Sequence, residues 1–269
     1  MPANLTLLHV KLLAIPGVTQ MTANGINDHG QVVGQFTDSH GMPHGFIYEE
    51  ESFCQLDYPG AAETNILGIN NLSQMVGMFT TLTATAGFLY DRGTFSPPIT
   101  YPGPGNLTVP NGVNDRGEIV GVFQDAGPGE HSFLYKAGNY EPLTYPGATE
   151  TAAQGINNSG QVVGSFPDVA GTHGFVYLEN VGVFSPPLNC PTGIMTTIRG
   201  INNGGQIVGG CFDAQGHEHP FLYIAGALHR ILIPGATSAS ANSVNDRGQI
   251  VGDFQSATGA HSFVAAIPA

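Results

Sequence analysis

A row of histidines, most of them preceded by an aspartate, recurs along this sequence. Its regular spacing would place these side chains on one face of the fold. The row consists of His44, His131, His173, His219 and His261, with Asp38, Asp125, Asp168 and Asp213 five or six residues upstream of the first four. Imidazole and carboxylate groups gathered on one face are typical of metal binding and general acid–base catalysis. A feature that nearly every copy of a repeat shares more often holds the repeat together, through hydrogen bonds to loop backbone. We therefore favour a structural role for this row.

A second row differs between copies, and we expect binding residues there. It is the residue before each Gly-Ile-Asn-type motif, which we place near a central funnel: Asn24, Leu67, Asn111, Gln154, Arg199 and Asn242. With Phe212, these are the candidate ligand-binding residues. An amide-lined funnel also permits a Ca²⁺ site, although Ca²⁺ needs carboxylates that this row lacks. Glu63 and Glu150 on neighbouring loops are candidates to supply them.

The fifth copy of the repeat departs most from the others. Arg199 is its solitary cation in the funnel row, and it either recognises an anionic group or forms an ion pair with a nearby carboxylate. His217 and His219, with Asp213, are weak candidates for a two-histidine metal site. The second copy contributes apolar Leu67 opposite Arg199. A funnel that is cationic on one side and apolar on the other suits a small carboxylate or a sugar acid.

The elements that position these rows follow from an internal repeat. Six copies carry Gly-Ile-Asn or a close variant, and their Asn residues, from Asn27 to Asn245, are 43, 44, 43, 45 and 43 positions apart. Each copy contains four runs rich in Val, Ile, Phe and Tyr, bounded by Gly, Pro, Asn and Asp, which is the composition of short strands and tight turns. Four strands in about 44 residues is the period of a propeller blade.

We therefore predict an all-β fold, a six-bladed β-propeller with four-stranded blades, in a single domain over residues 1–269. The last copy ends at its third strand, near Phe263, whereas residues 5–15 resemble a fourth strand that no unit precedes. We expect this N-terminal strand to complete the last blade and close the ring, which protects the strand edges.

The repeated motif resembles that of the HAF-repeat proteins. The matching residues are Gly-Ile-Asn-x-x-Gly-Gln-Val-Val-Gly-x-Phe followed by His-Gly-Phe-x-Tyr, as at His44–Tyr48 and His173–Tyr177, and the second copy departs from the pattern with Ala86 in place of His. These proteins are mostly bacterial, often extracellular and functionally ill-defined. The resemblance spans all six copies, implies β-propeller-type repeats and secretion, and supplies no activity.

The three cysteines point to a disulfide and to a compartment. Cys190 and Cys211 occupy two rows that hold bulky side chains in the other copies, about 21 residues apart. If the rows touch, this double change replaces an apolar pair by a disulfide; the alternative is two unrelated buried thiols. A disulfide implies an oxidising location, extracellular or periplasmic. No signal peptide is recognisable before Gly17, so we expect a trimmed mature chain, with Cys54 free and buried.

Composition and charge exclude several classes of function. The chain has 7 Lys and Arg against 20 Asp and Glu, a net charge of −13, which argues against nucleic acids and anionic membrane surfaces. No apolar stretch approaches the ~20 residues of a membrane helix. Nucleophile motifs such as Gly-x-Ser-x-Gly are absent from the sequence.

We predict a monomeric, secreted ligand-binding or interaction module that uses its loop-rich face and central funnel. Its partner is a small molecule, a carbohydrate-derived ligand or an unidentified protein. The alternative is a hydrolase or lyase with its active site in the same funnel, metal-assisted or using His and Glu as acid and base. A single asymmetric constellation around Arg199 would favour catalysis, because one substrate needs one site.

Overall fold

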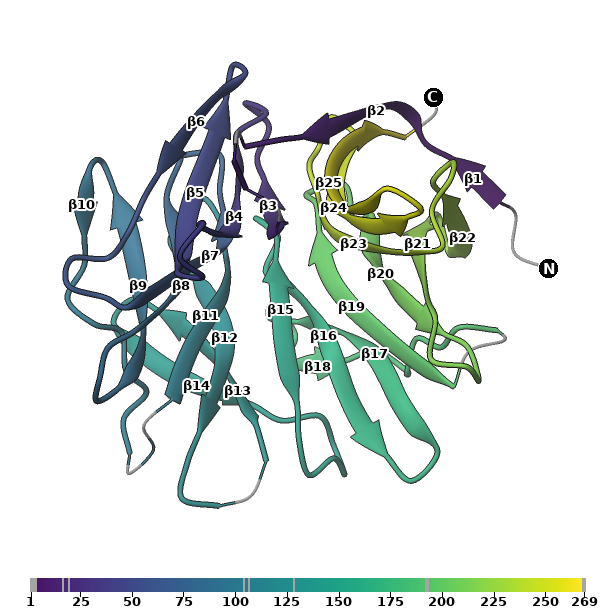
Figure 1. Ribbon diagram of the computed structural model, residues 1–269. Helices are drawn as coiled ribbons and strands as arrows, with labels where there is room; N and C mark the ends of the chain where they lie inside the picture. Colours follow the sequence, from purple (N-terminus) through teal and green to yellow (C-terminus); the bar gives the residue numbers. More distant parts are fainter. Residues whose placement is uncertain are drawn as a thin grey trace.

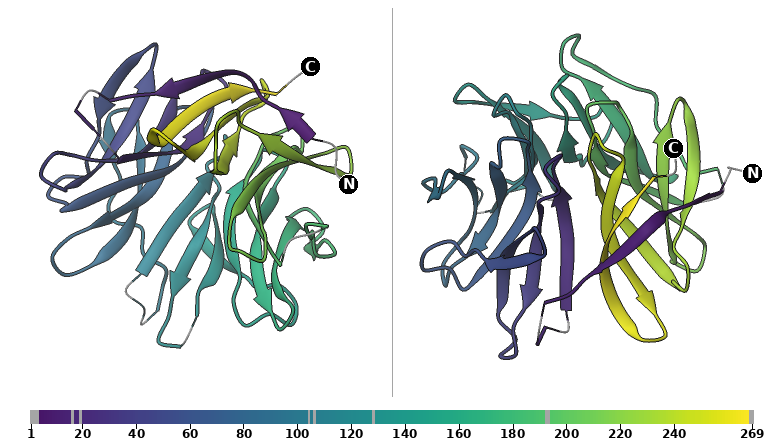
Figure 2. Two further views of the ribbon diagram at one scale, coloured as in Figure 1. Left: turned by 45° about the vertical axis from the view of Figure 1, so that its right-hand side comes forward. Right: turned by 90° about the horizontal axis from the view of Figure 1, so that it is seen from above.

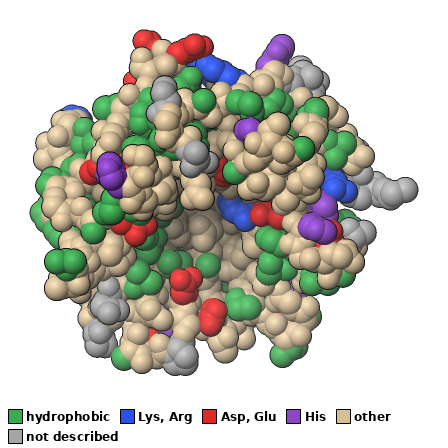
Figure 3. Space-filling model, viewed as in Figure 1, with side chains coloured by type: hydrophobic (Ala, Val, Ile, Leu, Met, Phe, Trp, Pro, Cys, Tyr) green, Lys and Arg blue, Asp and Glu red, His purple; other side chains and the backbone are tan. Residues whose placement is uncertain are grey.

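The structure is a computed structural model, and it describes residues 4–267 except 16, 19, 104, 106, 128, 192 and 193. Over these residues the chain forms 25 strands and no helix. Figures 1 and 2 show the sheets side by side around a central axis, with one strand of each repeat lining it, which is a β-propeller-like arrangement. A hollow opens at the centre of the face in Figure 3, with charged side chains on its wall.

Four of the sheets contain four strands each. The first repeat forms β3 (Gln20–Ile26), β4 (Val32–Thr37), β5 (Pro43–Glu49) and β6 (Ser52–Gln55). The second forms β7 (Glu63–Ile69), β8 (Met75–Thr80), β9 (Thr85–Asp91) and β10 (Thr94–Phe95). The third forms β11 (Leu107–Val113), β12 (Ile119–Gln124), β13 (His131–Lys136) and β14 (Asn139–Leu143). The last forms β23 (Ser238–Val244), β24 (Gln249–Ser256) and β25 (Gly259–Ala266), and β2 (Leu8–Leu13) pairs antiparallel with β25.

The fourth and fifth repeats share one nine-stranded sheet. The fourth repeat forms β15 (Ala152–Ile156), β16 (Gln161–Asp168), β17 (Gly171–Leu178) and β18 (Val183–Phe184). The fifth forms β19 (Met195–Ile201), β20 (Ile207–Phe212), β21 (Glu218–Ile224) and β22 (Ala227–Leu232). A parallel bridge between Thr172 and Met195 joins β17 to β19, and β1 (Asn4–Thr6) adds a parallel strand to β22.

The prediction of six uniform four-stranded blades closed into a ring by the N-terminal strand is therefore wrong. Main-chain pairing gives five sheets, because β19 begins at Met195, within pairing distance of β17. The merged sheet has nine strands because β1 pairs with β22 of the fifth repeat. Repeat spacing in the sequence carries no information about either contact. The all-β class agrees with the prediction.

The core lies between neighbouring sheets and is built from repeated apolar rows. The third strand of each repeat contributes one Phe with no exposed surface: Phe46, Phe88, Phe133, Phe175, Phe221 and Phe263. Alternation along each inner strand sends one set of side chains to this core and the other to the axis. The glycine of the Gly-Ile-Asn motif lets inner strands approach closely, since a Cβ on Gly68 would lie 2.7 Å from the carbonyl oxygen of Asn111.

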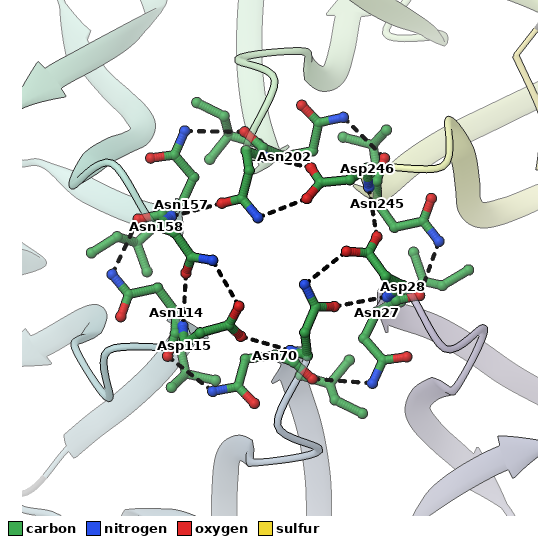
Figure 4. A pocket seen from close by; sticks show the side chains of 18 residues that line it. Asn27, Asp28, Asn70, Asn114, Asp115, Asn157, Asn158, Asn202, Asn245 and Asp246 are labelled. Atoms are coloured by element: carbon green, nitrogen blue, oxygen red, sulfur yellow. Dashed lines mark hydrogen bonds between the residues drawn. The ribbon is translucent and has the colours of Figure 1, made fainter.

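The Asn of each motif connects its repeat to the next one (Figure 4). Asn157 illustrates the pattern: its Oδ1 accepts the backbone N–H groups of Ser159 and Gln161, and its Nδ2 donates to Gln161 Oε1 and to the backbone oxygen of Asn202. The same inter-repeat bond joins each Asn to the next, and Asn245 Nδ2 donates at 2.9 Å to the backbone oxygen of Asn27. This cycle of side-chain hydrogen bonds runs through all six repeats; it comprises Asn27, Asn70, Asn114, Asn157, Asn202 and Asn245.

The predicted disulfide between Cys190 and Cys211 is confirmed, with the two Cα atoms 5.8 Å apart. Equivalent rows do touch in the other repeats: the rings of Tyr58 and Phe79 stack with centroids 3.7 Å apart, and Tyr101 stacks on Phe123 at 3.5 Å. The disulfide therefore takes the place of an aromatic stack. Cys54 is free as predicted but exposed rather than buried, because it lies on the edge strand β6.

Removing the disulfide should lower the free energy of unfolding by about 3 kcal/mol, because the bond closes a loop of 21 residues in the unfolded chain. We expect this loss in the Cys190→Ser/Cys211→Ser double variant, measured by denaturant unfolding. Cys54→Ser is the matched control and should unfold like the parent. Equal stability of the double variant and the control would contradict the prediction.

Candidate functional site

A channel along the central axis forms the candidate site. It consists of three cavities, each sharing lining residues with the next: a wide end of about 730 Å³, a neck of about 90 Å³ and a polar end of about 70 Å³ between the Asn-rich turns. Figure 4 shows the polar end, where side chains that include Asp28, Asp115 and Asn158 point toward the axis. Of these three cavities, as the described residues form them, the wide end is the one with room for a small organic ligand.

The six candidate residues of the funnel row all lie on the wall of this wide cavity. They are Asn24, Leu67, Asn111, Gln154, Arg199 and Asn242, each partly buried, and they also form the neck. Each lies on the inner strand of its repeat, just before the Gly of the motif, which is Ser243 in the sixth repeat. Phe212, the seventh candidate, is at the end of β20 and is not among the lining residues, so the structure does not group it with the others.

Arg199 is paired with a carboxylate. Its Nη1 donates to Glu218 Oε1, and the two side chains are 28% and 15% exposed. Glu218 reaches this position over Gly210, where an added Cβ would lie 2.1 Å from the same carboxylate oxygen. Of the two alternatives left open by the sequence, the ion pair is the observed one, and this removes the main support for an anionic ligand.

A second carboxylate, Asp253, lies on the same wall and was missed by the sequence analysis. Its Oδ2 accepts a hydrogen bond of 2.8 Å from Asn242 Nδ2, and its Oδ1 lies 2.5 Å from Ser262 Oγ and 3.3 Å from the backbone nitrogen of Ala23. Burial raises the pKa of Asp253 to about 6, against the opposing effects of these hydrogen bonds and of the Arg199 charge. A carboxyl with this pKa can exchange a proton near neutral pH.

Proton counting at Ser262 agrees with the raised pKa of Asp253. The Ser262 hydroxyl has one hydrogen but lies within hydrogen-bond distance of two oxygens, Asp253 Oδ1 and the backbone oxygen of Met21 at 3.0 Å. The Met21 oxygen can only accept. Both contacts are hydrogen bonds at once when Asp253 holds a proton and donates it to Ser262, which then donates to Met21. This geometry favours the protonated carboxyl.

The signal for Asp253 was present in the sequence. It occupies the position between Gly and Phe on the second strand of each repeat, with Cys211 in place of Phe in the fifth. The six copies read Gln35, Met78, Val122, Ser165, Gly210 and Asp253. This row differs between copies as much as the funnel row does. A carboxylate among buried residues is costly unless it is paired or hydrogen-bonded, so its presence in one copy alone is a signal. The last two members of the row, Gly210 and Asp253, bring both carboxylates to the Arg199 side of the cavity.

The weak metal candidates His217, His219 and Asp213 do not form a metal site. Asp213 Oδ2 lies 2.9 Å from His219 Nε2 and 3.4 Å from His217 Nδ1, while Arg230 Nη2 donates to His219 Nδ1 at 2.8 Å. The positive charge of Arg230, which is hydrogen-bonded to His219, would repel a metal cation at this position. Across the part of the chain that the structure describes, no three His, Cys, Asp or Glu side chains come together to hold a metal ion.

The same finding applies to a Ca²⁺ ion in the funnel. Of the two carboxylates considered for it, Glu150 lines the cavity, whereas Glu63 Oε1 accepts a hydrogen bond from Gln35 Nε2 at 3.0 Å and is not a lining residue. The residues present do not gather the carboxylates that Ca²⁺ prefers.

The Asp and His row has the structural role that we favoured. Asp38 Oδ1 accepts the backbone N–H groups of His40 and Met42, both at 2.8 Å, and Asp213 Oδ1 accepts those of Gln215 and His217, both at 2.9 Å. The backbone bond from Met42, with smaller contributions from other donors, lowers the pKa of Asp38 to about 2. These carboxylates fix their loops and remain ionised at neutral pH.

Comparison with known proteins supports the fold and leaves the family undefined. No protein-family model matches the chain, and no curated protein sequence matches it. Within the described residues no helix is long and apolar enough to cross a membrane.

Several solved structures are similar in fold. A gluconolactonase from Xanthomonas campestris is 13% identical with a TM-score of 0.61, over 100% of this chain and 95% of that one. Virginiamycin B lyase from Staphylococcus aureus is 13% identical with a TM-score of 0.56, over 96% and 99%. TolB from Acinetobacter baumannii is 12% identical with a TM-score of 0.61, over 88% of this chain; the match spans only 63% of TolB. At these identities the likeness shows a β-propeller-like fold and nothing finer.

Proposed function

We propose that this protein is a hydrolase or lyase whose active site is the wide end of the axial channel, at the wall formed by Arg199, Glu218 and Asp253. The observation that carries the proposal is a proton-exchanging carboxyl and a guanidinium on one side of a single cavity. The likeness to a gluconolactonase and to virginiamycin B lyase supports this enzymatic function over a simple binding module. One asymmetric cluster in a sixfold repeat suits one substrate.

In hydrolysis, Asp253 acts as the general base. The carboxylate takes a proton from water as the water oxygen bonds to the carbonyl carbon of an ester or lactone, and the carbonyl π electrons move to oxygen. Arg199 has N–H groups beyond the one that Glu218 accepts, and these stabilise the resulting oxyanion. Collapse breaks the bond to the leaving alkoxide, which takes the proton back from Asp253.

A lyase reaction uses the same two groups. Asp253 removes a proton from the carbon next to a carbonyl, the electron pair forms a carbon–carbon double bond, and the bond from the next carbon to the leaving oxygen breaks. Arg199 stabilises the negative charge that develops on the carbonyl oxygen, and the leaving oxygen takes up the proton. Glu218 keeps Arg199 in place in both reactions.

Activity of Arg199 variants tests this proposal. We expect the wild type to cleave members of a panel of neutral lactones and linear esters. Cleavage is detected by the release of protons and by the mass of the products. Arg199→Met should lower kcat by about 10²–10³-fold, as expected for loss of a group that stabilises an oxyanion. Arg230→Met is the matched control, because Arg230 contacts His219 rather than the cavity. Absence of cleavage across the panel, or equal activity of the two variants, would overturn the proposal.

We propose further that the protein works outside the cytoplasm, in an extracellular or periplasmic location, as a monomeric HAF-repeat protein. The disulfide between Cys190 and Cys211 supports the oxidising location. The repeated Gly-Ile-Asn motif supports the HAF resemblance.

A further inference from the structure

The amide side chains in the funnel row have a fixed orientation. Asn24 Nδ2 donates at 2.9 Å to the backbone oxygen of Ile66, Asn111 Nδ2 to that of Ala153 and Asn242 Nδ2 to that of Ala23, both also at 2.9 Å. A backbone oxygen only accepts hydrogen bonds, so each amide must turn its NH₂ group toward the neighbouring repeat. The Oδ1 atom is then the polar atom left over on each of the three side chains.

These three amide oxygens face water. Among the described residues none of the three oxygens accepts a hydrogen bond. The described part of the chain also contains no buried side-chain oxygen or nitrogen without a partner. The three oxygens are therefore accessible to solvent, and since their residues line the wide cavity and its neck, they are accessible from the channel.

The charge of the cavity wall complements this array of acceptors. Glu150, Glu218 and Asp253 contribute carboxyl groups, and Arg199 is the one Lys or Arg side chain among the lining residues. The formal charge of the wall is −2 with Asp253 ionised and −1 with it protonated. A carboxylate ligand would meet repulsion and acceptor oxygens with few donors to bind it. The proposed small carboxylate or sugar acid therefore does not fit this cavity.

We infer that the channel selects neutral, hydroxyl-rich substrates, whose O–H groups donate to the Oδ1 atoms of Asn24, Asn111 and Asn242. This inference rests on the proposed function, and it names the substrate class: a polyhydroxylated ester or lactone whose carbonyl lies beside Arg199 and Asp253. A site built to bind substrate hydroxyls discriminates strongly against analogues that lack them, because its polar groups are then left without partners.

The test compares three lactones of one ring size: a trihydroxylated lactone, the unsubstituted lactone and a lactone bearing a carboxylate. We expect kcat/KM for the trihydroxylated lactone to exceed that for the unsubstituted one by at least about 100-fold. The carboxylate-bearing lactone should be the poorest substrate. Equal kcat/KM for the first two, or a preference for the carboxylate, would overturn the inference.

Asn111→Leu is the diagnostic variant. The second repeat has Leu67 at this position, so the fold accommodates leucine in the row. We expect the ratio of KM for the trihydroxylated lactone to KM for the unsubstituted lactone to rise about 10-fold. Thermal unfolding of the variant checks that its structure is retained. An unchanged KM ratio would contradict the inference and leave the proposed function standing.

A binding measurement separates failure of the inference from failure of the proposed function. Calorimetry on Asp253→Asn with an inert cyclic polyol, against its deoxygenated analogue, reports on recognition without catalysis. Binding of the polyol alone supports the inference even if no lactone is cleaved. Binding of neither compound overturns it. Polyol binding that chelator abolishes and Ca²⁺ restores would mean that the oxygens hold a cation, which also overturns it.

Discussion

Replacing Asp253 by asparagine should lower kcat/KM by about 10²–10⁴-fold, the range expected for loss of a general base. Asparagine keeps the size of the side chain, and its NH₂ group can donate to Ser262 as the protonated carboxyl does, while its oxygen accepts from Asn242. Only the long contact of 3.3 Å from the Ala23 backbone nitrogen to Oδ1 is lost. The fold is therefore retained and the proton-exchanging group is lost. Steady-state kinetics on the best substrate of the panel measure the effect.

The pH dependence should identify the group that is lost. The base is active when ionised, so wild-type kcat/KM should rise as the pH increases through about 6, the pKa of Asp253. The residual activity of Asp253→Asn should lack this rise. A wild-type profile that falls with increasing pH in this range would mean that Asp253 acts as an acid, and activity retained in the variant would exclude it as the base.

Asp253→Asn, which should lower activity, should raise the free energy of unfolding above pH 6. The folded pKa of Asp253 lies above the ordinary value of 3.8, so its favourable contribution is present at low pH and is lost as the pH rises through about 6. Ionisation of the partly buried carboxyl above that pH costs about 2–3 kcal/mol at most. Asp253→Asn should therefore gain stability relative to wild type between pH 4 and pH 8. Denaturant unfolding at the two pH values checks this sign.

Replacing Asn157 by alanine should lower the free energy of unfolding by about 4 kcal/mol. The side chain is 3% exposed and makes four hydrogen bonds, two as acceptor within its own turn, one to Gln161 and one to the fifth repeat. Each such bond contributes about 1 kcal/mol, and loss of the side chain leaves buried partners without an acceptor or donor. Denaturant unfolding monitored by circular dichroism measures the change.

Asn139→Ala is the control for this measurement. Asn139 is exposed and donates a single bond of 3.3 Å to the backbone oxygen of Ala137. We expect its replacement to change stability by less than about 0.5 kcal/mol. Similar losses in the two variants would show that the Asn cycle is not what holds neighbouring repeats together.

The features that recur in every repeat could be predicted from the sequence. Rows shared by all copies indicated the strands and the turns, and two bulky rows replaced together in one copy indicated the disulfide. Gly30 has a φ of 83° in the Asn-x-x-Gly turn, as the composition of that turn requires, and only Ser73 in the second repeat adopts the same turn without glycine, at 59°, among the described copies. Local chemistry determines these features, so they can be inferred from one sequence.

Contacts between copies were not predictable in the same way. The bridge between Thr172 and Met195 depends on how two strands end, and the pairing of Arg199 with Glu218 depends on the missing side chain at Gly210. We placed ligand-binding residues on the row before Gly-Ile-Asn and overlooked the row on the second strand, so Asp253 was missed. The orientation of an amide such as Asn111 follows only from the carbonyl that faces it.

The cycle of Asn side chains affects the order in which the repeats of this protein unfold. In a linear array of repeats, each terminal unit has one neighbour and frays before the centre. Here the bond from Asn245 to Asn27 gives the first and last units two neighbours each, like all the others. Amide exchange at the six turns should then slow to one common rate, set by global unfolding, instead of grading from the ends inward. Loss of one of these side chains weakens a single junction between neighbouring repeats, so exchange should then rise first at the two turns beside that junction.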